Sequence, residues 1–333
     1  RAAKKVAAMK FSLCLLLLCW GLSYCFSTKD PKLDSEWESW KTTYGKNYSE
    51  KEESFRRGVW EKNLKFINDH NRLHKEGKIT YYLGMNAFGD MTINETVRML
   101  SIATAPARIR RDTKLKTSTF PDLPTSVDWR EHGFMTPVRA QWTCASCWAF
   151  SAVGSLEGQL FRKSGKPLEM SKQMLIDCDR RQSCRGGSVI LAFKYMKKKG
   201  IVSEQCYPYK DKVNEDTLYI AILILGWPAL PKSGKALMRA VANVGPVSVT
   251  VHAIRSFFYY RGGVYTEPKC KKKYINHSVL VVGYGYEKEK ENKKYWILKN
   301  SWGARWGEKG YMRFQKDNNN QCGIATMAVY PVL

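Results

Sequence analysis

Residues 141–151 read Gln141-Trp-Thr-Cys-Ala-Ser-Cys147-Trp-Ala-Phe-Ser151, and this stretch decides the prediction of the fold. After Cys147, apolar side chains recur at helical spacing, at Phe150, Val153, Leu156 and Leu160. This spacing predicts a helix that begins near Cys147 and ends at Gly165. Unpaired N–H groups and the helix dipole stabilise negative charge at a helix start, so Cys147 is placed to react as a thiolate.

A nucleophilic thiol needs a group that accepts its proton and later returns it to the leaving group. Histidine does both near neutral pH. Five histidines occur, at positions 70, 74, 132, 252 and 277. His277 opens the apolar run Val279–Val282, which is typical of a buried strand and would hold the ring rigidly. We therefore expect His277 to be the acid/base partner of Cys147.

Three further side chains complete the predicted site. Asn300 follows the next apolar run, and its side-chain carbonyl can fix the tautomer of His277. Trp302 can shield that hydrogen bond from water. Gln141 offers an amide donor that would hold an oxyanion together with the Cys147 N–H. Each of these residues alone is more often structural, so the prediction rests on their joint order.

The cysteine count separates crosslinks from a reactive thiol. Ten cysteines occur, and three of them lie in the first 27 residues. The other seven are Cys144, Cys147, Cys178, Cys184, Cys206, Cys270 and Cys322. A secreted chain oxidises an even set, so an odd count leaves a thiol over. The C-x-x-C pair at 144–147 also suits zinc, but no second pair stands at ligand spacing. We predict disulfides, with no metal and no cofactor.

The order of these residues resembles that of the papain family of cysteine proteases. His277 lies 130 residues after Cys147, Asn300 lies 23 residues further, and C-x-x-C-W surrounds the nucleophile. The resemblance is to the cathepsin L branch of the family. Four blocks carry it, Val127-Asp-Trp-Arg-Glu131, Cys147-Trp-Ala-Phe-Ser151, Val281-Val-Gly-Tyr-Gly285 and Lys299-Asn-Ser-Trp-Gly303.

The N-terminal region carries a second part of the resemblance. One face of a predicted helix recurs at steps of three and four residues, at Glu52, Arg56, Trp60, Asn63, Ile67 and Asn71. This face and the helix-breaking segment 84–90 resemble the two propeptide motifs of the branch. The resemblance implies a signal peptide at 1–27, an inhibitory propeptide at 28–122 and a peptidase domain at 123–333.

The implied fold class is α+β and has two lobes. A helical lobe would carry Cys147, a β-barrel-like lobe would carry His277 and Asn300, and the helical propeptide would cover the cleft between them. The implied activity is that of a cathepsin L-like cysteine endopeptidase made as a zymogen. Acidification would loosen the propeptide, and cleavage within 108–123 would release the mature enzyme. The implied partners are protein and peptide substrates, the propeptide as inhibitor, and inhibitors of the cystatin type.

The resemblance also implies subsites and crosslinks. Gly186 and Gly187 would pair with substrate backbone. The main specificity pocket would comprise Ser188, Val189, Thr250, Ile275 and Met327. An apolar or aromatic residue is then expected at P2, two residues before the scissile bond.

By resemblance, Cys144 pairs with Cys184, and Cys270 pairs with Cys322. The family partner of Cys178 is absent from this sequence, and Cys206 is extra. By elimination these two are a candidate pair, which the sequence does not prove.

Several positions depart from the family pattern. Trp142 and Ala145 stand where the family usually has glycine, and Trp142 would be strained if its backbone has a positive φ. Ser188 replaces a usually apolar or aromatic pocket residue. Residues 218–230 are far more apolar than the family segment. These departures support an alternative function, a secreted binding protein on an inactive or weakened papain fold.

The N-terminus predicts entry into the secretory pathway. Basic residues precede a short apolar run that ends before Ser27, too short for a membrane span, and Met9 is the expected start. The expected location is lysosomal or extracellular. Glycosylation sequons occur at Asn47 and Asn94. A third, at Asn276, is expected to stay unmodified because folding should hide it.

The charge is strongly basic, +25 from 55 Lys and Arg against 30 Asp and Glu. Two clusters contribute, at 197–199 and 269–273. No nucleic-acid-binding motif accompanies them, so a specific nucleic-acid partner is not expected. A solvated basic face is the simpler interpretation, and polyanion binding is the alternative.

Overall fold

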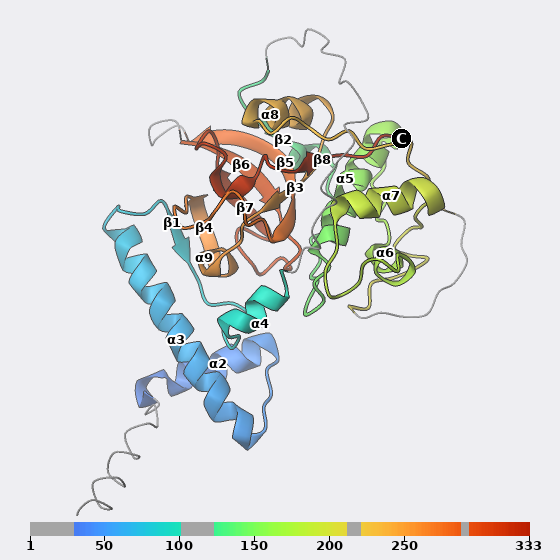
Figure 1. The fold of residues 1–333 in the computed structure, drawn as a ribbon. Helices are drawn as coiled ribbons and strands as arrows, with labels where there is room; N and C mark the ends of the chain where they lie inside the picture. The colour runs from blue at the N-terminus through green and yellow to red at the C-terminus, as the bar shows by residue number, and fades with distance from the viewer. Residues whose placement is uncertain (1–29, 101–122, 212–220, 288–292) are drawn as a thin grey trace, which may run out of the picture. The chain divides into compact units, whose positions relative to one another are not determined.

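The computed structural model describes residues 30–100, 123–211, 221–287 and 293–333 (Figure 1). The predicted signal peptide and cleavage linker lie outside these ranges, as do residues 218–220 of the apolar segment. The chain divides into two compact units. The first ends at Leu64 and the second begins at Lys65, and each is described by itself. None of the helices in the described ranges has the length and apolar character that crossing a membrane requires.

Most helices precede most of the strands along the chain. The helical segments are η1 (Pro31–Leu33), α2 (Asp34–Tyr44), α3 (Glu50–Lys75), α4 (Ile93–Arg98), η2 (Trp129–His132), α5 (Cys147–Ser164), α6 (Lys172–Cys178), α7 (Val189–Lys199), α8 (Gly234–Asn243), α9 (Arg255–Phe258) and η3 (Gln321–Gly323). The strands are β1 (Tyr81–Leu83), β2 (Val127–Asp128), β3 (Val247–Val251), β4 (Tyr260–Tyr265), β5 (His277–Glu287), β6 (Lys293–Lys299), β7 (Tyr311–Gln315) and β8 (Ala328–Val329).

The first unit is built on aromatic packing between α2 and the first half of α3. The Trp37 ring stacks on Trp40 at 5.2 Å and meets Trp60 edge-on at 5.6 Å. Arg56 pairs with Glu52 at 2.9 Å, as their i,i+4 spacing predicts. The predicted helix is therefore confirmed and extends over residues 50–75.

The strands of the second unit form one sheet, in the order β1-β4-β7-β6-β5-β3-β8, with β2 paired to β5. Strand β5 is buried over most of its length, as expected for a central strand with a continuous apolar run. Gly283 lets β2 approach this strand, because a Cβ there would lie 2.2 Å from the carbonyl oxygen of Val127. The start of β5, where His277 stands, is held by β3, in which Val251 lies opposite His277.

Helices α5, α6 and α7 share a second core beside the sheet, which includes Trp148, Leu156 and Phe193 (Figure 1). Helix α5 also packs on strands β3 and β5. Gly154 allows this close approach, because a Cβ there would lie 2.9 Å from a methyl carbon of Leu280. We call the contact between residues 147–158 and the strand residues 246–251 and 277–281 the α5–sheet seam.

Part of the predicted propeptide also belongs to the second unit. Strand β1 pairs with β4 in an antiparallel ladder. After it, the buried Asn86 amide donates to the Phe258 carbonyl at 2.8 Å and accepts from the Phe88 N–H at 3.0 Å. The Phe88 ring meets the Trp302 ring edge-on at 5.3 Å. The segment predicted to break the helix therefore docks on α9 through a buried side chain.

Replacing this side chain should loosen the docked segment. Asn86→Ala leaves the buried Phe88 N–H without its acceptor, which costs about 1–3 kcal/mol. We expect faster amide hydrogen exchange in β1 and in residues 84–90 than in the unchanged protein. Asn68→Ala, at an exposed position of α3, is the matched control and should leave exchange unchanged. Equal exchange in both variants would contradict the assignment.

Candidate active site

Cys147 is the first residue of α5, and its side chain is fully buried. The preceding Ser146 does not cap the helix, because its hydroxyl lies 2.9 Å from the Tyr209 hydroxyl instead. The backbone N–H groups of Ser278 and Trp148 donate to the Cys147 sulfur. Burial nevertheless raises the pKa of the Cys147 thiol to about 11, against the lowering effect of these N–H groups. The thiol is therefore neutral in the precursor. We call the precursor, with its propeptide segment still docked, the closed form.

His277 begins β5 and is also fully buried. Its Nε2 lies 2.8 Å from Oδ1 of Asn300, so Nε2 carries the proton and the amide oxygen accepts it. Burial lowers the pKa of His277 to about 4, although this hydrogen bond raises it. Nδ1 has no hydrogen-bond partner among the described residues. This nitrogen is therefore available as a base, and the residue after it, Ser278, borders the Cys147 sulfur.

The bond between His277 and Asn300 is enclosed by aromatic rings. The Trp302 ring stacks on the imidazole at 4.7 Å and on Phe258 at 4.7 Å. Oδ1 of Asn300 also accepts the Ser301 N–H at 2.8 Å, which fixes the orientation of the amide. The structure thus places Trp302 where the sequence predicts it, against the imidazole.

Gln141 is buried, and its amide is fully engaged. Nε2 donates to the Met99 carbonyl at 3.1 Å and to the Cys144 carbonyl at 2.9 Å, and Oε1 accepts the Ser301 hydroxyl at 2.6 Å. Met99 lies in the predicted propeptide. A propeptide carbonyl therefore occupies the donor that the sequence assigns to an oxyanion, which keeps this donor from a substrate in the closed form.

Comparison with known proteins agrees with this arrangement. Residues 123–332 match the family described as "Papain family cysteine protease", and residues 37–96 match the "Cathepsin propeptide inhibitor domain". The chain belongs to the papain family of cysteine proteases. Human cathepsin L2 is 45% identical over 97% of this chain and 99% of its own length. Rat procathepsin L is 43% identical over 96% of this chain and 98% of its own length.

A solved structure extends the agreement to three dimensions. Digestive procathepsin L 3 of Tenebrio molitor larval midgut superposes with a TM-score of 0.84 at 36% identity. The alignment covers 91% of this chain and all of that one. The predicted α+β papain-like fold with a helical propeptide is therefore confirmed, as is the prediction of a cathepsin L-like cysteine peptidase made as a zymogen.

The predicted subsite residues differ in burial and backbone conformation. Gly187 lies close against the Trp148 indole, since a Cβ at this position would be 2.5 Å from the ring. Gly186 has a φ of 121°, which favours glycine. Ser188, Val189 and Thr250 are buried, whereas Ile275 and Met327 are half-buried.

Sequence reasoning missed Ser278 as a site residue. Ser278 pairs with Thr250 across β3 and β5, and it borders the Cys147 sulfur. Its position directly after His277, at the start of β5, was the available signal.

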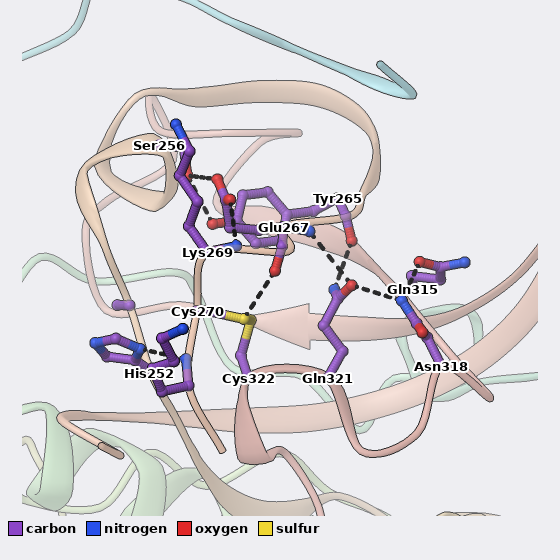
Figure 2. Close-up of a disulfide and its surroundings, with 12 residues drawn as sticks. His252, Ser256, Tyr265, Glu267, Lys269, Cys270, Gln315, Asn318, Gln321 and Cys322 are labelled. Atoms are coloured by element: carbon purple, nitrogen blue, oxygen red, sulfur yellow. Dashed lines mark hydrogen bonds between the residues drawn. A yellow bond between two sulfur atoms is a disulfide. The ribbon is translucent and has the colours of Figure 1, made fainter. Parts of the chain in front are cut away.

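The disulfides of the papain-family resemblance are present. Cys144 is bonded to Cys184, and Cys270 is bonded to Cys322. Figure 2 shows the second disulfide beside Glu267, whose buried carboxylate accepts the Ser256 hydroxyl at 2.7 Å. The second disulfide ties the loop between β4 and β5 to η3.

The candidate bond between Cys178 and Cys206 is absent, which corrects the expectation from the sequence. Neither cysteine belongs to a disulfide. Cys206 is exposed on a turn, where its sulfur accepts the Ser203 hydroxyl at 3.2 Å, and Cys178 is half-buried at the end of α6. With Cys147, three cysteines of the described ranges stay outside the disulfides, rather than the one that the odd count predicts.

The two basic clusters are exposed. Lysines 197–199 end α7, and lysines 269 and 271–273 lie around the Cys270–Cys322 disulfide. This exposure supports the solvated basic face, and polyanion binding stays a prediction.

Trp142 has a positive φ, which is the condition under which the sequence analysis expects strain. Its φ is 51°, and its side chain is 62% exposed. A residue with a Cβ in this left-handed region costs about 1–2 kcal/mol. Ala145, at the other departing position, is fully buried and donates its N–H to the Cys184 carbonyl at 2.9 Å. The strain therefore falls on the residue next to Gln141.

Trp142→Gly should relieve this strain. The exposed ring contributes little packing. We therefore expect the free energy of unfolding, measured by urea denaturation, to rise by about 1 kcal/mol. Trp142→Ala is the matched control, since it also removes the ring but keeps the Cβ and the strain. A stability gain of the same size in both variants would contradict the backbone explanation.

Proposed function

We propose that the region from residue 123 to 333 hydrolyses peptide bonds, with Cys147 as nucleophile and His277 as acid and base. The observation that carries this proposal is the orientation of His277. Its Nε2 is committed to Asn300, and its Nδ1 has no hydrogen-bond partner among the described residues beside the Cys147 site. A base whose second nitrogen is fixed by a third group is the arrangement that nucleophilic catalysis needs.

The first half-reaction follows from these positions. Nδ1 of His277 takes the proton of the Cys147 thiol, and the sulfur attacks the carbonyl carbon of the scissile bond. The Gln141 amide and the Cys147 N–H stabilise the oxyanion that forms. His277 then gives its proton to the leaving amine, the carbon–nitrogen bond breaks, and a thioester remains on Cys147.

The second half-reaction restores the enzyme. Water replaces the amine, His277 takes one of its protons, and the resulting hydroxide attacks the thioester. The acid product leaves, and the sulfur recovers its proton from His277. Asn300 positions the imidazole in both halves through the same hydrogen bond, which the Trp302 ring keeps from water.

Acidification opens the closed form because of the buried His277. The pKa of this histidine is about 4 in the closed form, against an ordinary value of 6.5. The closed form therefore binds fewer protons than an opened, hydrated one. As the pH falls from 6.5 toward 4, the opened form gains stability relative to the closed form. Departure of the propeptide also frees the Gln141 amide from the Met99 carbonyl.

The finer features follow the family resemblance. Cleavage between residues 108 and 123 separates the propeptide from the mature enzyme. The pocket that includes Val189, Ile275 and Met327 takes an apolar or aromatic P2 side chain. The relatives belong to the secretory pathway, and this enzyme acts in lysosomes, outside the cell, or both. Inhibitors of the cystatin type bind the opened cleft.

A second candidate function rests on the strained Trp142. If strain beside Gln141 misplaces the oxyanion donor, the protein is a secreted binding protein with a weakened site. The neutral thiol and imidazole do not favour this candidate, because their burial in the precursor accounts for both pKa shifts.

Activity of the acid-treated precursor tests the proposal. We expect cleavage of a peptide with Phe or Leu at P2, and labelling of Cys147 by an epoxide inhibitor. Both should increase as the activation pH is lowered from 6.5 toward 4, and both should be absent from Cys147→Ser. Cys206→Ser removes an exposed thiol that is not one of the proposed catalytic residues, and it is the control. Absence of cleavage and of labelling would refute the proposal.

A further inference from the structure

The described part of the apolar segment, residues 221–230, is held to the surface by backbone hydrogen bonds. Near its start, Ile222 exchanges two of them with Ile201, at 2.8 and 2.9 Å. Further along, the Leu225 N–H donates to the Val332 carbonyl at 2.7 Å. The segment is therefore fixed on either side of Leu223 and Ile224, and its outward side chains keep a defined place.

The side chains of this segment alternate between the core and solvent. Ile224 is 2% exposed and belongs to the core that α5, α6 and α7 share. Its neighbours Leu223 and Leu225 are 57% and 68% exposed, and Val332 is 38% exposed. Successive residues of an extended chain point to opposite sides, so the two leucines project from the same side. We call Leu223, Leu225 and Val332 the leucine patch, since single exposed apolar residues are ordinary but grouped ones are not.

The basic cluster at 197–199 adjoins the leucine patch through the same backbone pairing. Gly200 follows the lysines directly, and a Cβ there would lie 2.5 Å from the Ala221 side chain. The next residue, Ile201, pairs with Ile222, which directly precedes the leucine patch. The end of α7 and the patch therefore lie side by side, near the C-terminus of the chain (Figure 1).

The charge of these lysines is not neutralised locally. Lys194 and lysines 197–199 are exposed on α7, a helix without acidic residues. In the part of the chain that the structure describes, no carboxylate forms an ion pair with any of them. Basic residues in a last turn suit the helix dipole. That preference does not account for leucines exposed beside them.

We propose that the leucine patch and lysines 197–199 form a docking surface for a membrane that carries anionic phospholipids. The lysines match the negative surface of such a membrane, which attracts clustered basic residues. The leucines can enter the boundary between headgroups and acyl chains, as the apolar faces of peripheral proteins do. A polyanionic polymer would use the lysines alone and leave the leucines in water, so the combination favours a lipid surface.

Vesicle binding by the precursor tests this inference. The precursor is sedimented with vesicles of phosphatidylcholine alone, and with vesicles that contain about 30% phosphatidylserine. We expect binding to the mixed vesicles only, and weaker binding in added salt because the lysines are exposed. Equal binding to both kinds of vesicle, or binding to neither, would overturn the inference.

The apolar half of the surface is tested by the double variant Leu223→Ser, Leu225→Ser. It should bind the mixed vesicles about 10-fold more weakly or less, because two leucines no longer leave water. Val97→Ser, at a 54% exposed position of α4, is the matched control and should bind as the unchanged protein does. If the double variant also binds unchanged, the lysines act alone on any polyanion, and the inference fails.

Two triple variants remove equal charge from different places. The test variant carries Lys197→Gln, Lys198→Gln and Lys199→Gln. The control variant carries Lys271→Gln, Lys272→Gln and Lys273→Gln. We expect the test variant to lose on the order of 100-fold in vesicle binding, about 5-fold for each lysine, and the control to lose far less. Equal losses would show that net charge alone attracts the vesicles, which would overturn the inference.

Sedimentation velocity without lipid tests the remaining occupant, a second copy of the chain. We expect the unchanged precursor to be monomeric at concentrations where it binds vesicles. A dimer that the Leu223→Ser, Leu225→Ser variant dissociates would assign the leucine patch to another copy and overturn the inference. None of these measurements uses catalysis, so their outcome is independent of the proposed peptidase activity.

Discussion

The packing of α5 against β3 and β5 is the contact on which the catalytic arrangement depends. Cys147 and His277 are 130 residues apart in sequence, and each is the first residue of its element. Serine hydroxyls and the close approach at Gly154 fix how the helix lies on the strands. The N-terminus of the helix and the start of the strand therefore arrive at the same end of the seam.

Buried charge supports the same contact from the side. The Glu157 carboxylate, on α5, accepts the Thr136 hydroxyl at 2.7 Å and the Met170 N–H at 2.9 Å. Lys299 donates to the Thr136 carbonyl at 2.6 Å, and burial lowers its pKa to about 8. Since Lys299 precedes Asn300, this network links α5 to the residue that orients the imidazole.

Much of the site was predictable from sequence because its signals are local. The helical stripe after Cys147 and the apolar run after His277 each identify an element and the residue at its start. The strain at Trp142 was only partly predictable, because the family usually has glycine both there and at Ala145, and only Trp142 has a positive φ. The hydrogen bond from Gln141 to Met99 was not predictable from sequence. Its acceptor is a backbone carbonyl, which every residue type has. The pairing of Thr250 with Ser278 depends on strand register, which no local pattern in either strand reveals. The pairing proposed for Cys178 failed because elimination says nothing about distance.

The central claim is that the Cys147 thiol and the His277 imidazole exchange a proton once the cleft opens. The most direct test is the thiolate absorbance of the mature enzyme against pH, taken as the difference from Cys147→Ser. The account predicts thiolate in the mature enzyme well below the ordinary thiol pKa of 9.0, lost in His277→Gln, whereas the intact precursor stays neutral up to about 11. A mature enzyme whose thiol titrates at 9 or above, with or without His277, would contradict it.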